Sequence, residues 1–162
     1  RILNLILGEF KRGNFSIDDP HYTDKYVPID IRMERNPKVK VEKKGDKVFI
    51  DVDIILEGDI LAIQSHANYE EEPQKSILEE AVKKRFKDDM NSLIDKCKEW
   101  GVDILHLGKK VSSCFSTIQE WEDFNWISKF KESEINVEID FVIRRTGTLL
   151  KSSPIITIEG KK

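Results

Sequence analysis

Gly45-Asp46 separates two segments in which apolar and polar residues alternate, and this short break constrains the fold most strongly. A two-residue loop with glycine first is the chemistry of a type II′ hairpin turn. If Lys44 pairs with Lys47, one register matches the residues of both segments: Val41 with Ile50, Val39 with Val52 and, on the opposite side, Lys40 with Asp51. Apolar pairs on one face and a charge pair on the other stabilise that register. The sequence therefore predicts antiparallel strands over 38–43 and 47–57, with a bend or bulge at Gly58.

Two further segments, 26–34 and 134–145, show the period of two that is typical of half-buried strands. Pro28 cannot donate a hydrogen bond to a ladder, so the strand over 26–34 is expected at a sheet edge or with its proline facing outward. Residues 2–7 favour a short strand, with a helix as the alternative, whereas the many turn residues over 11–25 indicate a loop.

The period changes to that of an amphipathic helix over 74–99. One stripe collects the apolar residues: Leu78, Ala81, Val82, Phe86, Met90, Leu93, Ile94, Cys97 and Trp100. Pro73 suits the first turn of this helix and Gly101 suits the position just past its end. The apolar face of the hairpin is the expected partner of the stripe, and the aromatic-rich segment 111–130 predicts one or two short helices.

Strands and helices occupy separate parts of the sequence, which favours an α+β fold over an alternating parallel one. We expect one mainly antiparallel twisted β-sheet packed against one long amphipathic helix plus short helices. The 162 residues suit a single domain over 1–162, since no repeat, linker or low-complexity tract interrupts them. The chain begins with arginine, so we expect it to be a fragment or a processed product of a longer protein.

Composition and motifs argue against several classes of function. The formal net charge of −3 gives no basic patch for the phosphates of nucleic acid, so no nucleic-acid partner is expected. His21, His66 and His106 lie in three separate segments without metal-ligand spacing, and no phosphate-cradling loop or nucleophile motif occurs. The sequence therefore predicts no catalytic residue, no metal and no cofactor.

Cys97 and Cys114 are too few for a disulfide scaffold and have no metal-binding partners nearby. We interpret both as buried free thiols, with a single disulfide as the alternative. Cys97 and His106 flank Gly101 and could be imagined as a nucleophile and its base, but ordinary packing explains them better.

Acidic residues occupy alternate positions of two predicted strands: Asp51, Asp53 and Glu57 on one, Glu138 and Asp140 on the other. Their spacing is that of a solvated sheet face rather than of paired catalytic carboxylates. Trp100, Trp121 and Trp126 could form a stacking platform for a ligand, although their apolar neighbours favour core packing.

Residues 76–111 begin as a charged amphipathic helix and lead into Asp-Ile-Leu-His-Leu-Gly at 103–108. Trp121 and Trp126 follow, and then a strand that ends in Ile-Arg-Arg-Thr-Gly at 143–147. The order of these segments resembles the C-terminal domain of the Ger(x)C spore germination lipoproteins, the C subunits of nutrient germinant receptors in Bacillus and Clostridium relatives, in which such a helix leads into Asp-Ile-[Phe/Leu]-x-[Phe/Leu]-Gly. The resemblance spans most of residues 9–150, and it departs at His106, where a small or aromatic residue is commoner.

The resemblance implies a non-catalytic subunit that helps a receptor complex to assemble or to signal when nutrients appear. Its partners would be the membrane-embedded A and B subunits of the germinant receptor. A lipid anchor on an N-terminal part that this sequence lacks would hold it on the outer surface of the inner spore membrane. The alternative is a small-molecule domain that binds the germinant in a pocket lined by the tryptophans.

The partner contacts are expected on outward polar positions of the sheet. The candidate residues are Asp51, Asp53, Glu138 and Asp140 on one sheet face, or Arg144 and Arg145 at the end of the last strand. Gly147 would allow a sharp turn after these arginines, which would cap carbonyl groups or pair with helix carboxylates. An anion site at the arginines is a minor alternative.

Overall fold

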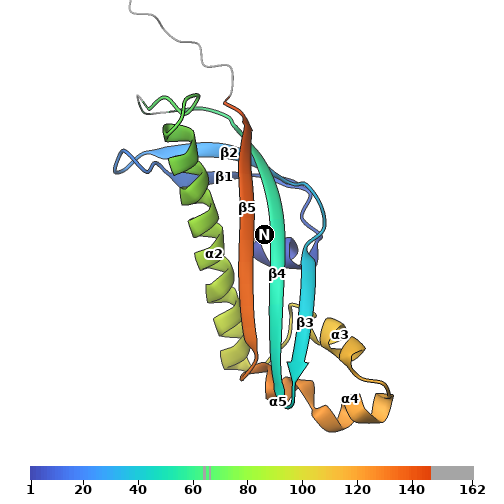
Figure 1. The fold of residues 1–162 in the computed structure, drawn as a ribbon. Helices are drawn as coiled ribbons and strands as arrows, with labels where there is room; N and C mark the ends of the chain where they lie inside the picture. The colour runs from blue at the N-terminus through green and yellow to red at the C-terminus, as the bar shows by residue number, and fades with distance from the viewer. Residues whose placement is uncertain (64, 66, 147–162) are drawn as a thin grey trace, which may run out of the picture.

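The computed structural model describes residues 1–63, 65 and 67–146, so His66 and Gly147 lie outside the described residues (Figure 1). Helices and strands follow one another in the order α1 (Ile2–Leu7), β1 (Arg12–Asp18), β2 (Tyr26–Met33), β3 (Lys38–Lys44), β4 (Lys47–Ile60), α2 (Gln74–Trp100), α3 (Gly108–Val111), the short 3₁₀ segment η1 (Ser112–Cys114), α4 (Ile118–Phe124), α5 (Trp126–Phe130) and β5 (Glu134–Arg145).

The long strand β4 organises the sheet. β5 pairs with β4 in parallel along nearly its whole length. β3 pairs with the first part of β4 and β2 with its last part, both antiparallel, and β1 extends the sheet beyond β2. The fold is therefore α+β with a mixed, mainly antiparallel sheet, as the sequence predicts. Figure 1 shows the short helices gathered near the turn that joins β3 to β4.

The hairpin register is confirmed. Val41 lies opposite Ile50, and Lys44 opposite Lys47. Gly45 adopts a φ of 60°, which the first central position of a type II′ turn requires. Local turn chemistry and alternation of apolar residues therefore agree on one pairing.

Gly58 marks the predicted bulge, because the register between β4 and β5 shifts between Gly58 and Asp59. A Cβ atom on Gly58 would lie 2.6 Å from the Phe141 ring and 2.8 Å from Ile29. The glycine is therefore required by close packing as well as by the bulge.

Helix α2 buries the centre of its predicted stripe against the sheet: Leu78, Val82, Phe86, Met90, Ile94 and Cys97. Gly101 ends the helix with a φ of 67°. Helix α2 packs mainly against β5, with smaller contacts to α1 and β1. The prediction that the hairpin would be its main partner was wrong. Trp100 is 65% exposed, contrary to prediction. Two turns before it on the same side of the helix, Leu93 is only partly buried, so Trp100 continues the margin of the stripe.

Two predictions for the N-terminal region were wrong. Residues 2–7 form the helix α1, which was the alternative to the favoured strand, and this helix ends at Gly8 with a φ of 74°. Residues 12–18 form the strand β1 within the predicted loop. Only Phe15 and Ile17 supply large apolar side chains to this strand, so its alternation is weak in the sequence, and pairing with β2 decides its conformation.

β2 lies between β1 and β4, so the predicted edge position was wrong. The alternative, an outward proline, describes Pro28. On β2, the residues Ile29–Met33 pair with β4, so Pro28 lies just beyond the hydrogen-bonded ladder between these two strands. The N–H group that proline lacks is therefore not needed in that ladder. The Pro28 carbonyl oxygen accepts a hydrogen bond from the Leu61 backbone N–H at 2.9 Å.

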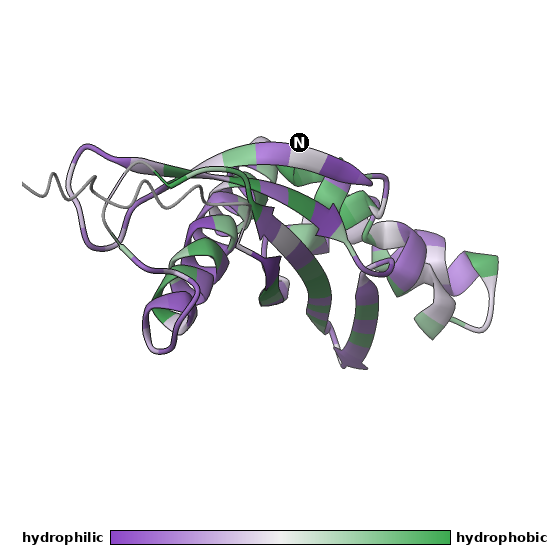
Figure 2. Ribbon diagram, turned by 90° about the horizontal axis from the view of Figure 1, so that it is seen from above, coloured by the Kyte–Doolittle hydropathy of each residue, from purple (hydrophilic) through white to green (hydrophobic). Residues whose placement is uncertain are grey.

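One hydrophobic core joins the inner face of the sheet to α1, α2 and the short helices. Figure 2 shows hydrophobic and hydrophilic positions in alternating bands along the strands of the hairpin, as expected for a sheet with one buried face. No helix in the described part of the chain combines the length and the apolar composition that crossing a bilayer requires.

Candidate interaction surface

The solvent side of β2, β3, β4 and β5 is named the outer face, and the predicted acidic residues meet there. Asp53 on β4 pairs with Glu138 on β5, whereas Asp51 lies beside Asn136 and Asp140 beside Ile55. The parallel pairing of two strands that are distant in the sequence thus forms a contiguous acidic strip, defined as Asp51, Asp53, Glu138 and Asp140. The sequence placed these residues on two strands, and the structure brings them together.

Lysines from both sides flank the acidic strip. Lys40 on β3 lies 3.7 Å from Asp53, and from α2 Lys87 lies 3.2 Å from Glu138 and Lys83 lies 3.9 Å from Asp140. These pairs are largely exposed, and exposed ion pairs contribute only about 0–1 kcal/mol each. The strip is therefore a solvated, mixed-charge surface whose groups are free to change partners.

Among the described residues Arg144 pairs with a strand carboxylate, and not with the carbonyl groups or helix carboxylates that the sequence suggested. Its Nε donates to Glu57 Oε1 on β4 at 2.7 Å, and the Arg144 guanidinium holds the pKa of Glu57 below its ordinary value. Arg32 on β2 also contacts Glu57, and it donates to Asp59 Oδ2 at 2.7 Å. These four residues form the arginine–carboxylate cluster. Arg145 is exposed and stands opposite Asp59 in the register of the sheet.

Asp30 and Arg12 extend the arginine–carboxylate cluster, and sequence reasoning missed both. Asp30 is only 4% exposed and accepts a hydrogen bond from Arg12 Nε at 2.6 Å. That bond keeps the pKa of Asp30 below its ordinary value despite burial. Asp30 and Arg32 occupy alternate positions of the otherwise apolar β2, which was the signal available in the sequence.

Asp103 organises the family-like motif after α2. Its carboxylate accepts hydrogen bonds from the backbone N–H groups of Leu107 at 3.1 Å and Gly108 at 2.6 Å, and from the Trp126 indole at 2.8 Å. A Cβ atom on Gly108 would lie 2.5 Å from the Trp126 ring. Leu105 and Leu107 are buried, so the motif is a packing unit and not a reactive site.

Cys97 and His106 do not form a nucleophile–base pair. Cys97 is completely buried, and burial raises the pKa of its thiol, whereas His106 is exposed with a φ of 55°. Both cysteines are free, as predicted, but Cys114 is exposed rather than buried.

The three tryptophans do not share one environment. Trp100 is exposed, Trp121 is partly buried and Trp126 is buried beside Phe130. The prediction of core packing is correct for Trp126, partly correct for Trp121 and wrong for Trp100. The three tryptophans therefore do not form a common stacking platform for a ligand.

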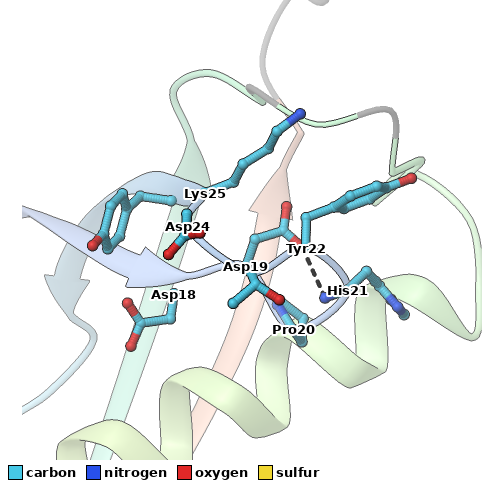
Figure 3. A pocket seen from close by; sticks show the side chains of 9 residues that line it. Asp18, Asp19, Pro20, His21, Tyr22, Asp24 and Lys25 are labelled. Atoms are coloured by element: carbon cyan, nitrogen blue, oxygen red, sulfur yellow. Dashed lines mark hydrogen bonds between the residues drawn. The ribbon is translucent and has the colours of Figure 1, made fainter.

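Asp19 is a second buried carboxylate that the sequence did not reveal, because it lies in a predicted loop. It is 7% exposed and accepts hydrogen bonds from Ser65 Oγ and Tyr69 Oη, each at 2.6 Å, and from the His21 backbone N–H at 2.9 Å (Figure 3). Burial acts to raise the pKa of Asp19, but these hydrogen bonds outweigh it and lower the pKa. Burial, together with the bond to Asp19, raises the pKa of Tyr69.

An open hollow of about 420 Å³ adjoins the loop after β1. Figure 3 shows that Asp18 points away from Tyr22 and Lys25, and Lys25 Nζ lies over the Tyr22 ring, 5.3 Å from its centroid. Among the described residues no group of three or more His, Cys, Asp or Glu side chains could hold a metal ion. The Asp19 network is therefore a structural clamp between two connections.

Comparison with known proteins places this architecture. The comparison with curated protein sequences finds no match. The solved structure described as "Crystal Structure of the GerBC protein" matches with a TM-score of 0.67 at 19% identity, covering 88% of this chain and 44% of that chain. This chain thus spans less than half of the length of that protein. A family model described as "Spore germination B3/ GerAC like, C-terminal" matches residues 1–147, and the chain therefore belongs to this family of spore germination proteins.

Proposed function

We propose that this chain is the C-terminal domain of the C subunit of a nutrient germinant receptor and serves as a non-catalytic interaction module. The family match and the GerBC-like fold support this assignment. Its partners would be the membrane-embedded A and B subunits. A lipid anchor on an N-terminal part of the longer subunit would hold the domain on the outer surface of the inner spore membrane.

The observation that carries the proposal is the outer face. The acidic strip and the arginine–carboxylate cluster lie on one continuous sheet surface formed by β2, β4 and β5. Mixed charge at an interface fixes register and partner choice more than it raises affinity. A weak contact would suffice, because anchoring beside the partners raises their effective concentration.

The test reverses exposed charges on the outer face. Asp51→Lys with Glu138→Lys probes the acidic strip, and Arg145→Glu probes the end of β5 without breaking the Arg144–Glu57 pair. Glu122→Lys on α4, also exposed, is the matched control. Each full-length lipoprotein would be produced in spores, its folding checked by thermal unfolding of the purified domain, and the levels of the A and B subunits and the nutrient response measured.

We expect the outer-face variants to lower receptor levels and slow nutrient germination, while Glu122→Lys behaves as the parent. If every outer-face variant keeps the parental receptor levels and nutrient germination, the outer face is not the docking surface. Germinant binding by the domain itself is less well supported, because the hollow beside the β1–β2 loop is open to solvent. An increase in the unfolding temperature of the domain in the presence of any germinant would favour germinant binding over docking.

A further inference from the structure

A groove of about 540 Å³ crosses the outer face from β3 to β5 at the end where β5 begins. Phe49 contributes half-buried apolar surface to it from the outer face, whereas Ile135 pairs with Ile50 and packs against the core from the inner face. Phe49 is an aromatic residue at an outward position of β4, where the alternating neighbours Lys47, Asp51 and Asp53 are charged. A half-exposed ring among charges offers apolar contact area that water solvates poorly.

Carboxylates dominate the rim of this groove. Glu42, Asp51 and Glu134 line it, together with the single cation Lys98. Lys98 is already engaged, because its Nζ donates to the Ser133 carbonyl oxygen at 2.6 Å. The Asp51 carboxylate accepts only a long bond of 3.3 Å from the Asn136 amide, and the Glu134 carboxylate makes no hydrogen bond or ion pair with the described residues. These carboxylates keep unused acceptor capacity for an incoming cation.

The chain itself shows that this surface holds an ammonium group. Lys44 Nζ lies 5.4 Å from the centroid of the Phe49 ring and 3.0 Å from Glu42 Oε1. An aromatic face and a carboxylate thus receive one side-chain cation from within the β3–β4 hairpin. Asp51 and Glu134 place further carboxylates at other points of the rim.

We propose that the groove is an anchor point for a lysine or arginine side chain of a protein partner. The aliphatic stem of the side chain would cover Phe49 while its charged head meets Asp51 and Glu134. Long cationic side chains combine an apolar stem with a charged end, so they match a groove with an apolar floor and an acidic rim. The proposal rests on the docking role of the outer face and names the chemistry of the partner.

The test is an NMR titration of the isotopically labelled chain with N-acetyl-arginine amide and, as a neutral probe of the same shape, N-acetyl-citrulline amide. The arginine probe should shift backbone amides around Phe49, Asp51 and Glu134, with an affinity about fivefold or more above that of the citrulline probe. Phe49→Leu, which keeps apolar volume, and Glu134→Gln should each weaken arginine binding about threefold, whereas Glu122→Gln should leave it unchanged. Equal shifts with both probes, or shifts spread over acidic residues of α4, would overturn the proposal.

Spore experiments with the same substitutions separate this inference from the docking function. Phe49→Leu and Glu134→Gln should lower the levels of the partner subunits. The same effect is expected of the double variant Asp51→Lys with Glu138→Lys. If only the charge reversals lower those levels, the docking function stands and the anchor role of the groove fails. If the groove binds the arginine probe but no outer-face variant changes the spores, the docking function fails and only the cation preference remains.

Discussion

Trp126 donates its indole N–H to Asp103 Oδ2 at 2.8 Å, and the same oxygen accepts the backbone N–H of Gly108 at 2.6 Å. One carboxylate oxygen therefore ties the segment after α2 to the start of α5. This contact gives a physical reason for an aspartate, a glycine five positions later and a tryptophan further along the chain.

Gly108→Ala should destabilise the domain by about 1–3 kcal/mol, the usual cost of overpacking. The new Cβ atom would lie 2.5 Å from the Trp126 ring. Alanine is the better helix former, so a loss of stability would show that the clash prevails over propensity. Urea unfolding measures the change, with Lys109→Ala as the exposed neighbour control. Equal stability of the two variants would contradict the tight contact.

The tryptophans should differ in their effect on stability. Trp126→Phe keeps a ring but leaves Asp103 without the indole donor, and we expect a loss of about 1–3 kcal/mol. Trp100→Ser alters an exposed side chain and should change stability by less than about 0.5 kcal/mol. Guanidinium unfolding followed by circular dichroism compares them. Similar losses for both would mean that Trp100 packs against the protein in solution.

The two faces of β5 should respond differently to alanine. Ile139→Ala empties a buried site on the inner face and should cost about 2–5 kcal/mol. The adjacent Glu138→Ala removes an exposed side chain of the outer face and should cost less than about 0.5 kcal/mol. Denaturant titrations of both variants provide the test, and equal costs would show that the faces are wrongly assigned.

The Asp19 clamp should make stability depend on pH. The pKa of Asp19 is lowered in the folded protein, so its stabilising contribution is fully present above the unfolded pKa, near 4. The contribution is lost as the pH falls through the lower, folded pKa. The parent should therefore exceed Asp19→Asn in stability at pH 7, and the difference should shrink toward pH 3.

Urea unfolding across this pH range, with Tyr69→Phe as a second variant that removes one donor, measures the effect. Comparing parent and variant at each pH isolates Asp19 from the other carboxylates of the domain. A difference that stays constant down to pH 3 would mean that the ionised carboxylate is not what stabilises the clamp.

The sequence by itself determined the hairpin, the long helix and the last strand of this protein, but not α1 and β1. Turn chemistry at Gly45 and the alternation around it specify the hairpin register, and the periodic stripe with Gly101 specifies α2 and its end. These features depend on neighbours in the chain, so their physical causes are visible without the fold. The alternation of β5 likewise predicted which of its residues face solvent, although the role of that face in docking remains a proposal.

Only the tertiary structure decided which elements meet. The parallel pairing of β4 with β5 joins Asp53 to Glu138, and the position of α2 beside β5 brings Lys87 to the same carboxylate. Asp19 and Tyr69 are 50 positions apart, and neither shows in its local sequence that it has a buried partner. Local periodicity sets which side of an element is apolar, but the choice among apolar partners depends on packing the whole core at once. The strip, the clamp and the groove follow from that choice.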